Sequence, residues 1–275
     1  MKNLINFLKK YNLLFTAIFF KRIFFSFYKI LENIGNSFYW FVNSKEHTNF
    51  SFELSENNLD SVILFLQNNF HLEKTKIEEL INDSKSVNFS KRDYKYPFST
   101  SFADVDFKNK WDYRLLPFII FFLTDIKYIF EFGYDQGRLP LLIYKNYEKN
   151  KFLNKNYIGI DINPRKGALV NKLPIIENIC LINQSLQDYI DNENLIKFNE
   201  SIVISSTHEK TSEKYLFNKL RKENVFPKII ISDEVGKNSS YKSFVENEIY
   251  SNSILIFNDK NNFLNPLYIG ISIKK

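Results

Sequence analysis

The residues best suited to bind a ligand follow an apolar run at 128–130 that has the composition of a buried strand. Glu131 ends this run, and Gly133 and Gly137 stand in the short polar loop that follows, ahead of a segment of helical character. Gly133 permits a tight turn, and Gly137 lets the start of a helix approach a ligand closely. A strand that turns sharply into a helix in this way is where an α/β sheet binds a nucleotide-like ligand.

Polar side chains follow three further predicted strands. Asp161 ends one of them, where a carboxylate can accept hydrogen bonds from both hydroxyls of a ribose. Gln184 and Ser185 follow the next strand, in a position to meet an adenine edge. Ser205 ends a fourth strand, and His208 comes shortly after it. Because the carboxyl ends of parallel strands meet at one edge of a sheet, we expect these side chains to lie near the glycine loop.

These segments belong to a regular alternation of strands and helices from residue 127 onward. The expected strands are 127–132, 157–161, 178–183, 201–205, 228–232, 254–258 and 267–273. The expected helices are 137–149, 164–173, 211–223 and 240–250. Alternation of this kind predicts an α/β fold with a mostly parallel sheet of seven strands, covered by helices on both faces. Only a loop separates the last two strands, so we expect the last one to run antiparallel.

Residues 1–110 have a different pattern, and we expect them to form a helical region and a loop ahead of the sheet domain at 111–275. Further helices are expected at 58–70, 75–86 and 111–124. The stretch at 87–110 is aromatic and polar without periodicity, which predicts a long loop. Long loops in compact domains are often functional lids or binding segments.

The excess positive charge of the chain lies in its first 31 residues. These contain six bases and no acid, and the whole chain carries a net charge of +6. The bases are Lys2, Lys9, Lys10, Lys21, Arg22 and Lys29. The rest of the chain is therefore neutral overall, which argues against nucleic acid as a partner of the sheet domain.

Two roles fit the arm formed by residues 1–44, which we expect to be helical. It can be a cap whose wide apolar face packs on the main domain or on a second subunit. It can also be an interfacial arm that places Phe and Ile side chains into lipid while its bases meet anionic head groups. The longest uncharged run within residues 1–31, at 11–20, is shorter than the roughly 18 residues that cross a bilayer.

Cysteine and histidine are scarce. The single Cys180 excludes internal disulfides and a cysteine-based metal cluster, and the three histidines show no ligand spacing. We therefore expect no metal, and a reducing, cytoplasmic location.

In the four segments described above, the sequence resembles the class I S-adenosylmethionine-dependent methyltransferases. The segment IFEFGYDQGR is similar to the first motif of that family, with Glu131, Gly133 and Gly137 in its positions. YIGIDINP is similar to the second motif, with Asp161 as the ribose-binding acid, and LINQSLQDY is similar to the third. VISSTHEK resembles the segment after the fourth strand of small-molecule methyltransferases. The resemblance covers residues 111–275 and implies a Rossmann-like sheet.

The resemblance implies that S-adenosylmethionine is the cofactor and that a small hydroxylated acceptor, such as a sugar of a surface polysaccharide, is methylated. It implies cofactor contacts from Glu131, Gly133, Gly137, Asp161, Gln184, Ser185 and Ser205. A general base helps transfer to a hydroxyl, and His208 is the only histidine expected at this edge. His208 can also be a helix-start residue that only lines the cofactor cleft.

Two other functions share parts of this pattern. A nicotinamide dehydrogenase needs glycines where this chain has Asp135 and Arg138, so its fingerprint is incomplete. The other alternative is a non-catalytic protein with a degenerate methyltransferase fold that acts as a binding partner or scaffold. It is motivated by Asp135, which replaces the middle glycine of the first motif.

Overall fold

A computed structural model describes most of the sheet domain and part of the region before it. The described residues are 51–55, 59–85, 114–134, 137–150, 154–162, 177–206, 210–232, 235, 240–246, 249–257 and 267–275. All of them belong to one unit of the chain. Outside them lie the arm at 1–44, the loop at 87–110, the expected helix at 164–173, Asp135 and His208. The division at residue 110 stays a prediction.

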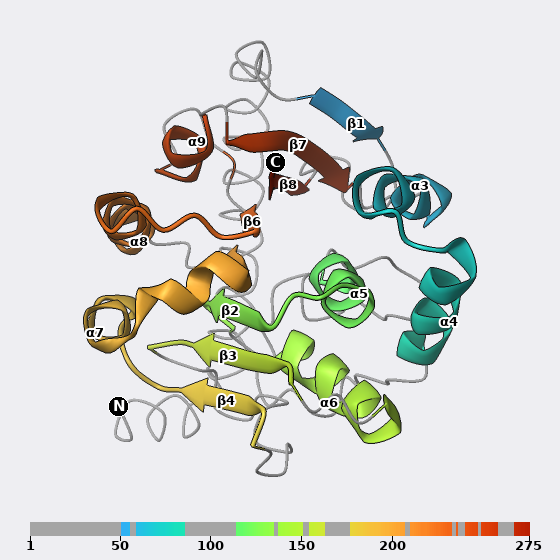
Figure 1. Cartoon of the computed structure of the whole chain (residues 1–275), viewed down its shortest axis with the longest axis horizontal. Coiled ribbons are helices and arrows are strands. Elements are labelled where there is room, and N and C mark those ends of the chain that lie inside the picture. The colour runs from blue at the N-terminus through green and yellow to red at the C-terminus, as the bar shows by residue number, and fades with distance from the viewer. Residues whose placement is uncertain are drawn as a thin grey trace, which may run out of the picture. The chain divides into compact units, whose positions relative to one another are not determined.

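The described residues form one sheet of eight strands (Figure 1). Their order across the sheet is β1 (Ser51–Ser55), β7 (Tyr250–Phe257), β8 (Leu267–Lys274), β6 (Ile229–Ser232), β5 (Ser201–Ser205), β2 (Tyr128–Phe132), β3 (Asn156–Ile160) and β4 (Ile179–Ile182). Neighbouring strands pair in parallel except at β8, which runs antiparallel to both β6 and β7. The prediction of a mostly parallel, Rossmann-like sheet with an antiparallel last strand is confirmed.

β1 is an eighth strand, which the sequence pattern did not predict. It adds to the edge of the sheet in parallel with β7. Its sequence, SFELS, alternates polar and apolar residues, but a run this short cannot be told from a loop by pattern alone. The expected helix at 240–250 is also wrong at its end, because α9 stops at Val245 and β7 already begins at Tyr250.

Helices cover both faces of the sheet (Figure 1). One face carries α3 (Leu59–Phe70), α4 (Lys74–Lys85), α5 (Leu115–Leu123) and α6 (Arg138–Asn150). The other face carries α7 (Leu186–Asn192), the 3-10 helix η5 (Leu195–Glu200), α8 (Lys210–Lys222) and α9 (Ser240–Val245). α7 and η5 were not predicted. Both are short, and both begin at a side-chain cap, Ser185 for α7 and Asn194 for η5.

The central strands are buried on both faces, because their side chains alternate between two apolar layers. Ile202 and Ile204 of β5 belong to the core that includes α3–α6. Phe130 of β2 faces the other layer, where it stacks on Phe198 of η5 with 4.0 Å between ring centroids. Burial on both faces explains why these strands are continuous apolar runs in the sequence.

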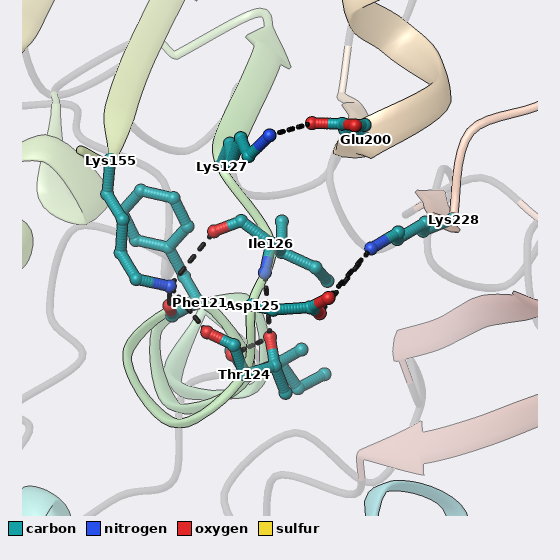
Figure 2. A network of polar contacts seen from close by, with 9 residues as sticks. Phe121, Thr124, Asp125, Ile126, Lys127, Lys155, Glu200 and Lys228 are labelled. Carbon is teal, nitrogen blue, oxygen red and sulfur yellow. Dashed lines mark hydrogen bonds and ion pairs between the residues drawn. The ribbon is translucent and has the colours of Figure 1, made fainter.

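Polar contacts fix the turn between α5 and β2 at the amino end of the sheet (Figure 2). The ammonium group of Lys155 donates hydrogen bonds to the carbonyl oxygens of Phe121, of Thr124 at 2.6 Å and of Ile126 at 2.9 Å. A helix end leaves carbonyl groups without partners in the helix, so this lysine satisfies the end of α5 and the turn after it. Burial lowers the pKa of Lys155 to about 8, which leaves the group mostly protonated at neutral pH.

Two ion pairs flank this turn. Lys127 lies 2.7 Å from Glu200, and Lys228 lies 3.3 Å from Asp125. All four side chains are exposed, and exposed pairs contribute little to stability. Lys155 is therefore the member of the network whose loss should matter.

We predict that Lys155→Met lowers the free energy of unfolding by about 1.5–3 kcal/mol, because three carbonyl groups lose a charged donor. The measurement is urea-induced unfolding of the full chain. Lys145→Met, at an exposed position of α6, is the matched control and should change stability little. Equal effects of the two substitutions would show that the three hydrogen bonds do not stabilise the turn.

Candidate functional site

The loop after β2 has the backbone that its glycines predict. Gly133 and Gly137 adopt positive φ angles of 85° and 75°, which residues with a side chain rarely tolerate. The N–H of Gly133 donates to the carbonyl oxygen of Ile160, and the N–H of Gly137 to that of Tyr134, both at 2.8 Å. α6 begins directly afterwards, at Arg138. The chain thus passes from a buried strand to a helix start within a few residues.

Glu131 is buried next to this loop, with 1% of its surface exposed. Its Oε2 atom accepts a hydrogen bond from the hydroxyl of Tyr157, on the neighbouring strand β3. Burial, and then the negative charge of Glu131, raise the pKa of Tyr157 well above its ordinary value, so the phenol stays protonated and donates. The positive charge of Arg114, at the start of α5, opposes part of this shift.

Gly159 makes room for this contact. It pairs with Glu131 in the register of β2 and β3. A Cβ atom at this position would lie 2.9 Å from Oη of Tyr157, 2.9 Å from Cδ1 of Tyr134 and 3.0 Å from Cδ2 of Leu181. Because side-chain atoms do not pack this closely, both tyrosines need a glycine between them.

Asp161 lies directly after β3, at the same edge of the sheet. Its N–H donates to the carbonyl oxygen of Ile182 at 3.1 Å, which continues the pairing of β3 with β4. With its side-chain nitrogen turned toward β3, Asn183 donates to the carbonyl oxygens of Asp161 at 3.1 Å and of Ile162 at 2.9 Å. Burial raises the pKa of Tyr134 to about 12, and the negative charge of Asp161 adds to the shift. Asp161 is therefore held at its backbone, and its charge acts on the glycine loop.

Gln184 and Ser185 lie between β4 and α7. The hydroxyl of Ser185 accepts a hydrogen bond from the N–H of Asp188 at 3.1 Å and donates to Oδ2 of the same residue at 2.6 Å. Ser185 is thus the N-terminal cap of α7. Gln184, directly before it, is partly exposed.

Ser205 and its neighbour lie at the end of β5. Ser205 is 3% exposed and pairs with Phe132 in the register of β2 and β5, so the two side chains share the face covered by α7–α9. The N–H of Ser206 donates to the carbonyl oxygen of Phe132 at 2.9 Å, which places Ser206 beside Gly133. His208 lies outside the described residues.

The structure therefore brings Glu131, Gly133, Gly137 and Asp161 to one edge of the sheet. Sequence reasoning missed Tyr157 and Tyr134. The signal for Tyr157 was present, because Tyr157, Gly159 and Asp161 are spaced by two and so share one face of the strand.

Searches with protein-family models and against curated protein sequences find no match. Among solved structures, the chain is similar to a precorrin-6y C5,15-methyltransferase from Geobacter metallireducens, with a TM-score of 0.45, 13% identity, and coverage of 66% of this chain and 95% of that one. It is similar to an rRNA methylase from Streptococcus thermophilus, with a TM-score of 0.36, 13% identity, and coverage of 55% and 88%.

A third similar structure is a tRNA (uracil-54, C5)-methyltransferase from Pyrococcus abyssi in complex with S-adenosyl-L-homocysteine. Its TM-score is 0.34, its identity is 15%, and the coverage is 58% of this chain and 36% of that one. At these TM-scores, the cofactor and the acceptor have to be inferred from this chain's own residues.

We predict that Gly159→Ala destabilises the fold by about 1–3 kcal/mol, because overpacking at a buried site forces its neighbours to move. Thermal and urea-induced unfolding of the full chain measure the change. An unchanged unfolding midpoint would show that Tyr134 and Tyr157 do not pack on Gly159 as described.

Proposed function

We propose that this chain binds S-adenosylmethionine at the carboxyl edge of β2 and β3 and acts as a methyltransferase. The observation that carries the proposal is the pair of left-handed glycines, Gly133 and Gly137, set between the acids Glu131 and Asp161 of adjacent strands. Carboxylates suit the ammonium group and the ribose hydroxyls of this cofactor, and glycine backbone allows a ligand to approach closely. The residues present therefore fit it.

When bound, this cofactor supplies a methyl group that its sulfonium already activates, so the reaction needs no metal. The work of the protein is then to align the acceptor with the methyl group and to exclude water. In this proposal Asp161 accepts hydrogen bonds from the ribose, Glu131 balances the positive charge of the amino-acid end, and Gln184 meets the adenine. Ser185 and Ser205 complete the proposed set, and His208 is the proposed general base.

We further propose a small hydroxylated acceptor, such as a sugar, in preference to nucleic acid. The support is the balance of charge outside the first 31 residues and the position of His208 in the sequence, shortly after β5. A non-catalytic scaffold is the alternative, and Asp135 in the first motif favours it. Calorimetry with S-adenosylhomocysteine separates the two functions, because only the enzyme requires that site.

We predict that Asp161→Ala weakens S-adenosylhomocysteine binding about tenfold to a hundredfold, since hydrogen bonds to a charged group are worth roughly 1.5–3 kcal/mol. Isothermal titration calorimetry on the full chain measures the affinity. Asp125→Ala, which removes an exposed acid at the opposite edge of the sheet, is the matched control and should leave affinity unchanged. If Asp161→Ala unfolds the protein and folded molecules bind as before, Asp161 is structural.

We also propose that the protein is cytoplasmic and reaches the inner face of the membrane through residues 1–31. Six bases and no acid on a segment rich in Phe and Ile suit reversible contact with anionic lipid. Among the described residues, no helix is long and apolar enough to span a bilayer. The cap alternative, in which the arm packs on protein, predicts no dependence on lipid.

We predict that the full chain sediments with anionic vesicles at low salt and is partly released as salt rises. Each base near an anionic surface contributes about 1 kcal/mol, and screening acts over roughly 8–10 Å at physiological salt. Replacing the six bases of residues 1–31 with Gln should leave the protein in the supernatant.

The control variant replaces six exposed lysines elsewhere with Gln, which changes the net charge equally. These are Lys74, Lys76, Lys145, Lys214, Lys222 and Lys275. It should still sediment with anionic vesicles. Equal binding of the unmodified protein to neutral vesicles would rule out a part for the bases.

A further inference from the structure

Glu131 and Tyr157 form a buried pair across two central strands. Both side chains are 1% exposed, and the phenol of Tyr157 donates to Oε2 of the carboxylate. A buried carboxylate without hydrogen bonds tends to take up a proton and become neutral. The hydrogen bond from Tyr157 favours the charged form, and it fixes the position of one of the two oxygen atoms.

The neighbouring residues are arranged for this contact. Gly159 stands opposite Glu131 in the sheet and leaves the space that the hydroxyl of Tyr157 occupies. Tyr134 packs on the other side of the same space, since its ring would also touch a Cβ at Gly159. The contact thus depends on residues of β2, of β3 and of the glycine loop.

The direction of the hydrogen bond is fixed as well. A phenol can donate or accept, but Tyr157 faces a carboxylate and stays protonated because burial and Glu131 raise its pKa. A carboxylate can accept about four hydrogen bonds, so the bond from Tyr157 is compatible with a second donor from a ligand.

We propose that Tyr157 is a positioning residue, which holds the Glu131 carboxylate in the orientation that receives the ammonium group of the cofactor's amino-acid end. The inference rests on the proposed function. The inference goes beyond that function, because it assigns part of the cofactor affinity to a side chain that the ligand does not touch.

The test compares two ligands on the full chain by calorimetry. S-adenosylhomocysteine carries the amino-acid end, and 5′-methylthioadenosine has the same nucleoside and thioether without it. Tyr157→Phe should weaken S-adenosylhomocysteine about tenfold, as expected for a hydrogen bond to a charged group, and leave 5′-methylthioadenosine within about twofold. A general loss of structure would weaken both ligands alike.

The matched control is Tyr189→Phe. Tyr189 is also buried and also donates to a carboxylate, Oε2 of Glu193 at 2.9 Å, but it lies on α7, which covers the opposite face of the sheet. This substitution should lower stability comparably and leave the affinities for both ligands unchanged. A difference between the two ligands in Tyr189→Phe would overturn the assignment to Tyr157.

A double-mutant cycle tests whether Tyr157 acts through Glu131. In a Glu131→Gln background, Tyr157→Phe should no longer change the affinity for S-adenosylhomocysteine. If the double variant loses affinity for S-adenosylhomocysteine by the product of the two single losses, the two residues act independently and the proposal is overturned. If Tyr157→Phe fails to fold, Gly159→Ala provides the test, because a Cβ at this position would lie 2.9 Å from Oη of Tyr157 and displace it, while Glu131 itself is unchanged. It should show the same difference between the ligands, and an equal loss for both would contradict the proposal.

The two proposals fail in different ways. If the unmodified protein binds neither ligand, the proposed cofactor is wrong, and the positioning role of Tyr157 is then wrong as well. If the unmodified protein binds both ligands and Tyr157→Phe changes both affinities equally, the proposed cofactor is supported and only the positioning role of Tyr157 is wrong.

Discussion

The candidate site depends on the in-register pairing of β2 with β3 on one side and β5 on the other. This register sets Glu131 opposite Gly159 and Ile204. A slip of one residue would turn every β2 side chain to the other face of the sheet. The carboxylate would then point into the aromatic layer that contains Phe198, away from Tyr157. The site is therefore specified by strand register before any loop takes part.

The register is in turn fixed by apolar side chains on both faces. Ile129 and Ile202 are fully buried against the helices of one face, and Phe130 stacks on Phe198 on the other. Because these side chains are closely packed on both faces, a shift in register would disrupt that packing. This apolar framework offsets the cost of burying a carboxylate at the end of the inner strand β2, where desolvation disfavours the charged form.

Most of the sheet was predictable because its strands are buried runs that alternate with amphipathic helices. The seven predicted strands all have counterparts, and the glycine loop has the positive φ angles that its residues require. What the sequence did not reveal depends on tertiary contacts. β1 exists because β7 offers it an edge, and α7 and η5 are short segments that local caps begin.

The candidate site also has a part that the sequence predicted and a part that depends on tertiary contacts. Glu131 and Asp161 were predicted from their places at strand ends, and the topology brings them to the same edge of the sheet. The partner of Glu131 was not identified, because a hydrogen bond between strands depends on register and on the space at one glycine. The hydroxyl of Ser185 also caps its own helix, a role that the sequence pattern did not predict, and its contact with a ligand stays a prediction.

The pairing of β1 with β7 has a consequence for how the molecule assembles during synthesis. Ser51 pairs with Ser253, so about 200 residues separate the two strands, and such a contact carries a large loop-closure entropy. A ribosome releases β1 early, and its partner strand appears only near the end of translation. Residues 51–55 therefore cannot pair with β7 until residues 250–257 have been synthesised, whereas the strands β2–β6 are already complete at residue 232.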